Sequence, residues 1–123
     1  MSKCILVVED QADNMQILRD LLVSADYEMI EAVNGEEALA AVAKRRPDLI
    51  LMDIQLPKMS GLDATRRLRA DPKTAAIPII VITSFALSGD DQKAKDAGAT
   101  AYMAKPYSPR ELLQMIRKLL PEQ

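Results

Sequence analysis

The stretch DLILMD at residues 48–53 is an apolar run that ends in a carboxylate. A run this uniformly apolar is typical of a strand in a parallel sheet that is covered on both faces. Three other stretches follow the same plan of an apolar run and then a reactive residue: CILVV (4–8) before Glu9 and Asp10, IPIIVI (77–82) before Thr83, and AYMA (101–104) before Lys105. If the four runs are neighbouring parallel strands, three carboxylates, a hydroxyl and an ammonium group meet at one edge of the sheet. In open α/β sheets this carboxyl edge is where ligands bind.

Short strand-like runs alternate with helical patterns five times along the chain. The predicted strands are residues 4–8, 28–32, 48–52, 77–82 and 101–104. The second of them is the most polar, so we expect it at an edge of the sheet. Five right-handed βα units predict an α/β fold with a doubly wound, five-stranded parallel sheet in strand order 2-1-3-4-5. In this order the four strands that end in reactive groups are adjacent.

Four helix starts are marked by a capping side chain that is followed three residues later by an acid. The expected caps are Asn34, Ser60, Ser88 and Ser108. Gly98 predicts the C-terminal end of the fourth helix. The first helix has no such signal, and we expect it to begin between residues 11 and 14.

The length and composition predict one globular domain over residues 1–123. The chain is 49% hydrophobic and 28% charged, and its formal net charge is −2. With no overall positive charge, neither nucleic acid nor an anionic membrane is an expected partner. The local basic cluster of Arg66, Arg67 and Arg69 is interpreted as the solvated face of a helix.

Cysteine and histidine usage excludes several kinds of chemistry. Cys4 is the only cysteine and there is no histidine. One thiol in an apolar run fits a buried residue in a reducing compartment. Without histidine, the chain has no His-ligated zinc site and no imidazole base. We also expect neither a signal peptide nor a membrane span, and therefore a cytoplasmic location.

The predicted edge of the sheet carries the groups that phosphoryl transfer needs. At close range Glu9, Asp10 and Asp53 would repel one another unless a cation joined them, and Mg²⁺ is the cation that suits such oxygen ligands. Lys105 and Thr83 can hold phosphate oxygens, and a carboxylate can attack phosphorus to form an acyl phosphate. Taken singly, each residue is better explained as the end of a strand or the start of a loop. Four strands that place suitable residues at one edge favour a Mg²⁺-dependent phosphoryl-transfer site.

Four motifs resemble the motif set of response-regulator receiver domains of two-component signalling, which have a flavodoxin- and CheY-like fold. They are VVED (7–10), MDIQLPKMSGL (52–62), VITS (81–84) and YMAKP (102–106). The resemblance covers essentially the whole chain. It implies that Asp53 is phosphorylated from a phosphohistidine on a sensor histidine kinase or a histidine phosphotransfer protein.

The resemblance also implies a set of metal ligands. Asp10 and Asp53 would bind Mg²⁺ directly, and Glu9 would bind it partly through water. Gln55 would contribute its backbone carbonyl. Many family members have Asp where this chain has Glu9, which gives the carboxylate a longer reach.

A second group of residues would respond to the phosphoryl group. By the resemblance, Thr83 and Lys105 hold it, and Ser84 is small enough to leave access to Asp53 open. Tyr102 matches the aromatic switch that turns inward as the threonine moves. The Lys105–Pro106 peptide bond is expected to be cis, a form that is accessible only before proline.

The stretch SFALSGDD (84–91) is most similar to that of stand-alone receivers of the DivK type. The chain is therefore expected to lack an output domain and to signal through a downstream effector protein. The apolar candidates for that contact, near the fourth helix, fifth strand and fifth helix, are Phe85, Leu87, Tyr102 and Tyr107. No enzymatic activity is expected beyond catalysis of its own phosphorylation and dephosphorylation.

Three alternatives remain. A phosphate sink or relay intermediate would use the same chemistry without a dedicated effector. A Mg²⁺-dependent phosphohydrolase usually carries a second acid two residues after its nucleophile, where this chain has Gln55. A flavin or nucleotide module needs a glycine-rich phosphate loop, whereas EDQADN (9–14) is acidic.

Overall fold

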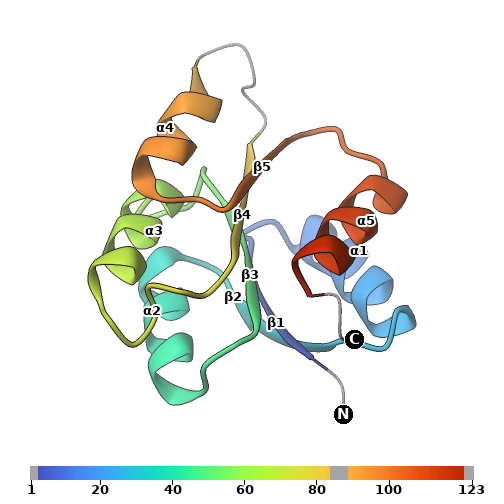
Figure 1. Cartoon of the computed structure of the whole chain (residues 1–123). Helices are drawn as coiled ribbons and strands as arrows, with labels where there is room; N and C mark the ends of the chain where they lie inside the picture. Colours follow the sequence, from blue (N-terminus) through green and yellow to red (C-terminus); the bar gives the residue numbers. More distant parts are fainter. Residues whose placement is uncertain (1–2, 84–88, 121–123) are drawn as a thin grey trace.

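The computed structural model describes residues 3–83 and 89–120. Strands and helices alternate within these residues: β1 (Cys4–Val8), α1 (Ala12–Ser24), β2 (Glu28–Ala32), α2 (Gly35–Lys44), β3 (Leu49–Asp53), α3 (Gly61–Ala70), β4 (Ile79–Thr83), α4 (Asp90–Ala97), β5 (Ala101–Ala104) and α5 (Pro109–Leu119). All strand pairs are parallel, in the order β2-β1-β3-β4-β5. Helices α1 and α5 cover one face of the sheet, and α2, α3 and α4 cover the other (Figure 1). The predicted fold class, strand order and edge position of β2 are confirmed.

Strand β3 begins and ends one residue later than predicted, so Asp53 is its last residue. The reason lies at Asp48. Here the side chain, rather than the backbone carbonyl, accepts a hydrogen bond from the neighbouring strand. Asp48 Oδ2 accepts a hydrogen bond of 2.7 Å from the Cys4 N–H, and the Asp48 N–H donates one of 2.8 Å to the Cys4 carbonyl. Cys4 itself is buried, as expected.

Strand β4 begins at Ile79, two residues later than predicted, and ends at Thr83. Pro78 has no N–H to donate to a neighbouring strand, so regular pairing starts after it. Its carbonyl still accepts a hydrogen bond of 2.9 Å from the Ile50 N–H. Both Asp53 and Thr83 are therefore held by the sheet itself.

Three of the four predicted caps are made by side chains. Asn34 Oδ1 accepts from the Glu37 N–H at 2.8 Å, and the hydroxyls of Ser60 and Ser108 accept from backbone N–H groups of the first turns of α3 and α5. Gly98 follows α4 with a φ of 103°, as the prediction of a C-cap requires. Helix α1 begins within the expected range but without a side-chain cap. Ser88 lies outside the described residues.

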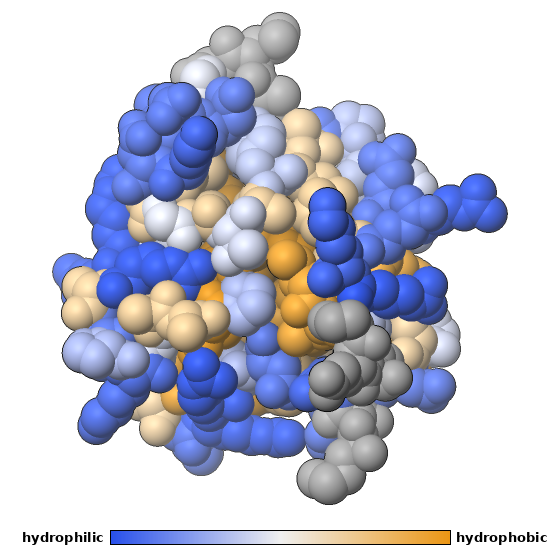
Figure 2. Space-filling view, in the orientation of Figure 1, coloured by the Kyte–Doolittle hydropathy of each residue, from blue (hydrophilic) through white to orange (hydrophobic). Residues whose placement is uncertain are grey.

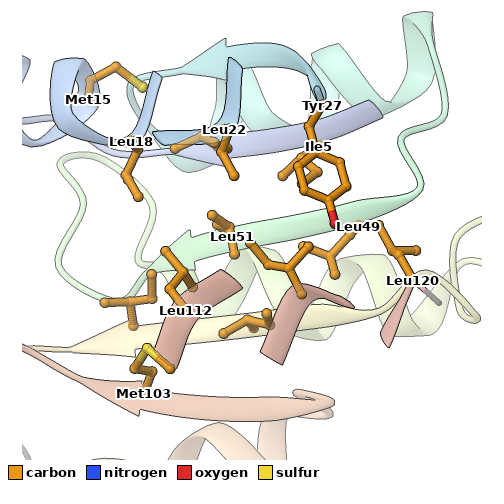
Figure 3. Packing of buried hydrophobic residues seen from close by; sticks show 14 residues of the cluster. Ile5, Met15, Leu18, Leu22, Tyr27, Leu49, Leu51, Met103, Leu112 and Leu120 are labelled. Carbon is orange, nitrogen blue, oxygen red and sulfur yellow. The ribbon is translucent and has the colours of Figure 1, made fainter. Parts of the chain in front are cut away.

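The sheet separates two hydrophobic clusters. Ile5 and Val7 of β1 point into the cluster beneath α1 and α5, whereas Leu6 and Val8 point into the cluster beneath α2, α3 and α4. Figure 3 shows the first cluster, where side chains from the sheet interdigitate with those of α1 and α5. Because both faces of the central strands are buried, their ends form a rigid base for a functional site.

The helices turn hydrophilic side chains outward. Figure 2 shows these over the outer surfaces of the helices, while hydrophobic atoms are visible mainly near the centre of the view, where the strands lie. Large hydrophobic residues that are exposed in the described part of the chain are Ile17, Val23 and Val33. Within that part, no helix is both long enough and apolar enough to cross a bilayer.

Arg69 does not belong to a solvated helix face, contrary to the interpretation of the basic cluster. Its guanidinium donates to the carbonyls of Ala75, Ile77 and Gly98, at 3.0, 2.6 and 2.6 Å, and to the Thr100 hydroxyl at 3.0 Å. It therefore ties the end of α3 to the segments that lead into β4 and β5. Arg66 and Arg67 are exposed, as expected.

Replacing Arg69 with methionine is expected to lower the free energy of unfolding by about 2 kcal/mol, because the half-buried carbonyls lose charged donors. Arg66→Met is the matched control on the same helix. Its exposed ion pair with Asp63, at 2.8 Å, should contribute less than about 1 kcal/mol. Urea denaturation followed by circular dichroism measures both. Equal losses in the two variants would mean that the Arg69 hydrogen bonds do not stabilise the fold.

Candidate functional site

Three carboxylates meet at the carboxyl edge of the sheet. Glu9 and Asp10 directly follow β1, and Asp53 ends β3, which pairs with β1 in a register that sets Val8 beside Met52. One oxygen from each of the three acids lies within 4.8 Å of the others. Glu9 and Asp53 are buried, whereas Asp10 is exposed. The predicted acidic cluster is thus present, with one open side.

Lys105 joins two of these acids. Its ammonium group lies 3.2 Å from Glu9 Oε1 and 3.2 Å from Asp53 Oδ2, and its side chain is 22% exposed. It reaches them from the segment after β5, and its own N–H donates to the Thr83 carbonyl at 2.7 Å. The Lys105–Pro106 peptide bond is cis, as the resemblance implies.

Backbone N–H groups hold the second carboxylate oxygen of Asp53 and of Glu9. The Gln55 N–H donates to Asp53 Oδ1 at 2.9 Å, and the Gln11 N–H donates to Glu9 Oε2 at 3.1 Å. Through the bond from Gln55, the backbone just after β3 contacts the Asp53 side chain. Each buried acid is therefore held from two sides, by the backbone and by Lys105.

The site has more negative than positive charge. Burial raises the pKa of the Glu9 carboxyl, and the nearby Asp53 adds to this, although the Gln11 N–H and Lys105 act in the opposite direction. Burial alone would lower the pKa of Lys105, but Asp53 and Glu9 outweigh it and the pKa is raised. One ammonium group cannot neutralise three carboxylates, so the cluster can hold a further cation. Hard oxygen ligands of this kind suit Mg²⁺.

Thr83 and Tyr102 lie on the neighbouring strands. Thr83 is fully buried at the end of β4, one position beyond the residue that pairs with Asp53. Tyr102 is half-buried on β5, pairs with Val81, and packs against the cluster beneath α2, α3 and α4. Both residues are thus on the two strands that follow β3 in the order of the sheet. Ser84, Phe85 and Leu87 lie outside the described residues.

Tyr107 lies between β5 and α5. It lines a groove of about 450 Å³ together with residues of α1 and the start of α5, with Lys105 at its edge. Ile17 in this groove is 57% exposed. Asn14 and Ile17 of α1 also line this groove and were not among the predicted site residues.

Comparison with known proteins agrees with the geometry. The family model of the response regulator receiver domain matches residues 5–117. The chain is 43% identical over 120 residues to the polar-differentiation response regulator DivK of Brucella anthropi, and 42% identical over 120 residues to that of Brucella ovis, with 98% of both chains covered each time. It is therefore a response-regulator receiver domain.

Solved structures of response regulators and receiver domains are also similar to this chain. The receiver domain of a sensor histidine kinase from Pseudomonas aeruginosa, with a magnesium ion coordinated in its active-site cleft, is similar with a TM-score of 0.92 and 34% identity, covering 99% of this chain and 100% of that one. The chemotaxis response regulator CheY4 of Vibrio cholerae has a TM-score of 0.90 and 30% identity, covering 97% and 99%. Among receivers, the chain is DivK-like.

The raised pKa of Glu9 predicts an unusual pH dependence in the metal-free protein. The folded state holds the Glu9 proton more tightly than the unfolded state does, so unfolding releases a proton. The stability contributed by Glu9 should therefore fall as the pH rises from the usual value of 4.5 through the raised pKa.

Glu9→Gln should remove this pH dependence and, at neutral pH in EDTA, stabilise the protein. Thermal denaturation of both proteins across the pH range measures the difference, with Glu111→Gln, an exposed acid on α5, as control. A wild type that gains stability relative to Glu9→Gln as the pH rises would contradict the expected sign.

Proposed function

We propose that this chain is a phospho-accepting response regulator of a two-component phosphorelay, with Asp53 as the acceptor. The donor is a phosphohistidine on a sensor histidine kinase or a histidine phosphotransfer protein. The observation that carries the proposal is the Lys105 ammonium group, 3.2 Å from both Asp53 and Glu9 within the three-carboxylate cluster. That arrangement pairs a nucleophile with a cation that can move to a phosphate oxygen.

In the proposed reaction an oxygen of Asp53 attacks phosphorus as the bond to the donor nitrogen breaks, and the imidazole leaves with the electron pair and takes up a proton. Lys105 then gives up its contact with a carboxylate and donates to a phosphoryl oxygen instead. The Thr83 hydroxyl donates to a second phosphoryl oxygen. Mg²⁺, held by Asp10, Asp53, the Gln55 carbonyl and in part Glu9, would supply charge neutralisation for the phosphoryl oxygens. The chain's own chemistry is then limited to its phosphorylation and dephosphorylation.

The signal leaves through a shift between two conformations. A doubly charged phosphoryl group on Asp53 would draw Thr83 toward it and let Tyr102 turn inward, which biases the surface of α4, β5 and α5. We propose that residues 1–123 act as one receiver unit that contacts a downstream effector protein there. The buried free thiol of Cys4 suits the cytoplasm, which is the location we propose.

Acetyl phosphate with Mg²⁺ is expected to add one phosphoryl group to the wild type, and Asp53→Asn should abolish this because the nucleophile is gone. Intact mass spectrometry measures the modification. Asp63→Asn, which removes an exposed acid on α3, should be labelled normally, and EDTA should prevent labelling. Wild-type labelling of the Asp53→Asn variant would show that another residue is the acceptor.

Lys105→Ala is expected to leave Mg²⁺ affinity within about threefold of wild type, because the metal takes over the charge neutralisation that lysine provides. The response of Tyr102 to phosphorylation should nevertheless weaken, since Lys105 no longer holds the phosphoryl oxygen. Calorimetric Mg²⁺ titration and the amide NMR shift of Tyr102 with beryllofluoride measure the two effects. Lys118→Ala is the control, and an undiminished Tyr102 shift in Lys105→Ala would remove the lysine from the switch.

A further inference from the structure

The first residue of α3 lies directly against the backbone of Asp53. A Cβ atom built at Gly61 would collide with the Asp53 carbonyl oxygen and would lie 2.8 Å from the Asp53 carbonyl carbon and 3.0 Å from the Ile54 Cα. All three atoms belong to the backbone, so none of them can rotate away as the end of a flexible side chain could. Any residue other than glycine at this position must therefore displace either the helix or the end of β3.

The helix is fixed in this position by buried hydrogen bonds. The Gly61 N–H donates to the Ile54 carbonyl at 3.0 Å, and the Gly61 carbonyl accepts from the hydroxyl of Thr65 at 2.8 Å. Thr65 is fully buried, and Ser60 caps the same turn. Lifting the turn off β3 would break the bond to Ile54, so a side chain at position 61 would also press on the end of β3.

That end of β3 is the segment on which the phosphate acceptor depends. The Ile54 N–H donates to the Ile82 carbonyl at 3.0 Å, and the Gln55 N–H donates to Asp53 Oδ1 at 2.9 Å. A shift of the Asp53–Ile54 peptide would therefore change both the position of the Asp53 carboxylate and the hydrogen bond that orients it. The carboxylates of Glu9 and Asp10, which follow β1, would stay in place.

We propose that Gly61 is a positioning residue: by having no side chain, it lets α3 seat the Asp53 carboxylate at the distance from Glu9 and Asp10 that metal binding and phosphorylation need. The inference rests on the proposed function of Asp53. It concerns steric exclusion, because the structure gives no left-handed backbone at Gly61 that would itself require glycine.

The test compares Gly61→Ala with Leu68→Ala, which opens the core beneath the same helix without touching Asp53. Gly61→Ala should weaken Mg²⁺ binding and slow labelling by acetyl phosphate by about tenfold or more, since a misplacement of about 1 Å can cost about 10²-fold. Leu68→Ala should lower stability but leave both within about twofold of wild type, because the site geometry is kept. Titrations contain sucrose, which favours the folded state of both variants.

A metal-free measurement separates positioning from loss of stability. In EDTA, the amide NMR shifts of Ile54 and Gln55 should change in Gly61→Ala and remain in place in Leu68→Ala. Unchanged shifts and wild-type Mg²⁺ affinity in Gly61→Ala would overturn the inference, as would equal losses in the two variants. If Gly61→Ala does not fold, Thr65→Val decides: losing the hydroxyl that donates to the Gly61 carbonyl should loosen the seat of this turn on β3 and weaken Mg²⁺ binding severalfold, and wild-type binding would overturn the inference. A wild type that neither binds Mg²⁺ nor becomes labelled would instead refute the proposed function, and the amide shifts would still test the positioning.

Discussion

Three carboxylates that repel one another set the main constraint on this structure. Because β1 and β3 are parallel neighbours, their carboxyl ends place three acids side by side. One oxygen from each of Glu9, Asp10 and Asp53 lies within 4.8 Å of the others. Such a cluster is stable only with positive charge nearby. The fold supplies one ammonium group, from Lys105, and leaves an exposed side at Asp10. The acidic edge can therefore hold a second cation, which the proposed phosphoryl group would need to offset its own negative charge.

The rest of the fold holds these charges in place against their repulsion. The strands that carry them are buried on both faces by the two hydrophobic clusters, and backbone N–H groups fix the oxygens that Lys105 leaves free. Lys105 itself stays partly exposed on a long, flexible side chain. A rigid set of acids with one adjustable cation can respond to phosphate by moving that cation, while the acids keep their positions.

Two errors of the sequence-based prediction have a common cause. Arg69 was interpreted as a solvated residue, yet its guanidinium donates to three carbonyls in the two segments that lead into β4 and β5. Strand β3 begins one residue later than predicted, because the side chain of Asp48 accepts the hydrogen bond from Cys4. In each case the deciding partner is distant in the sequence, so no local pattern of polarity or spacing could reveal it.

The sequence by itself determined the order of elements, the parallel sheet and the residues that end its strands, because alternating apolar runs, helix caps and reactive residues are all local features. Tertiary structure alone decided how close those residues come and what holds them. The distances between Lys105 and its two acids follow from strand packing, and the contact of Gly61 with Asp53 follows from the way α3 docks on β3. Both depend on atoms that meet across the fold, and no local pattern of residues gives the distances between them.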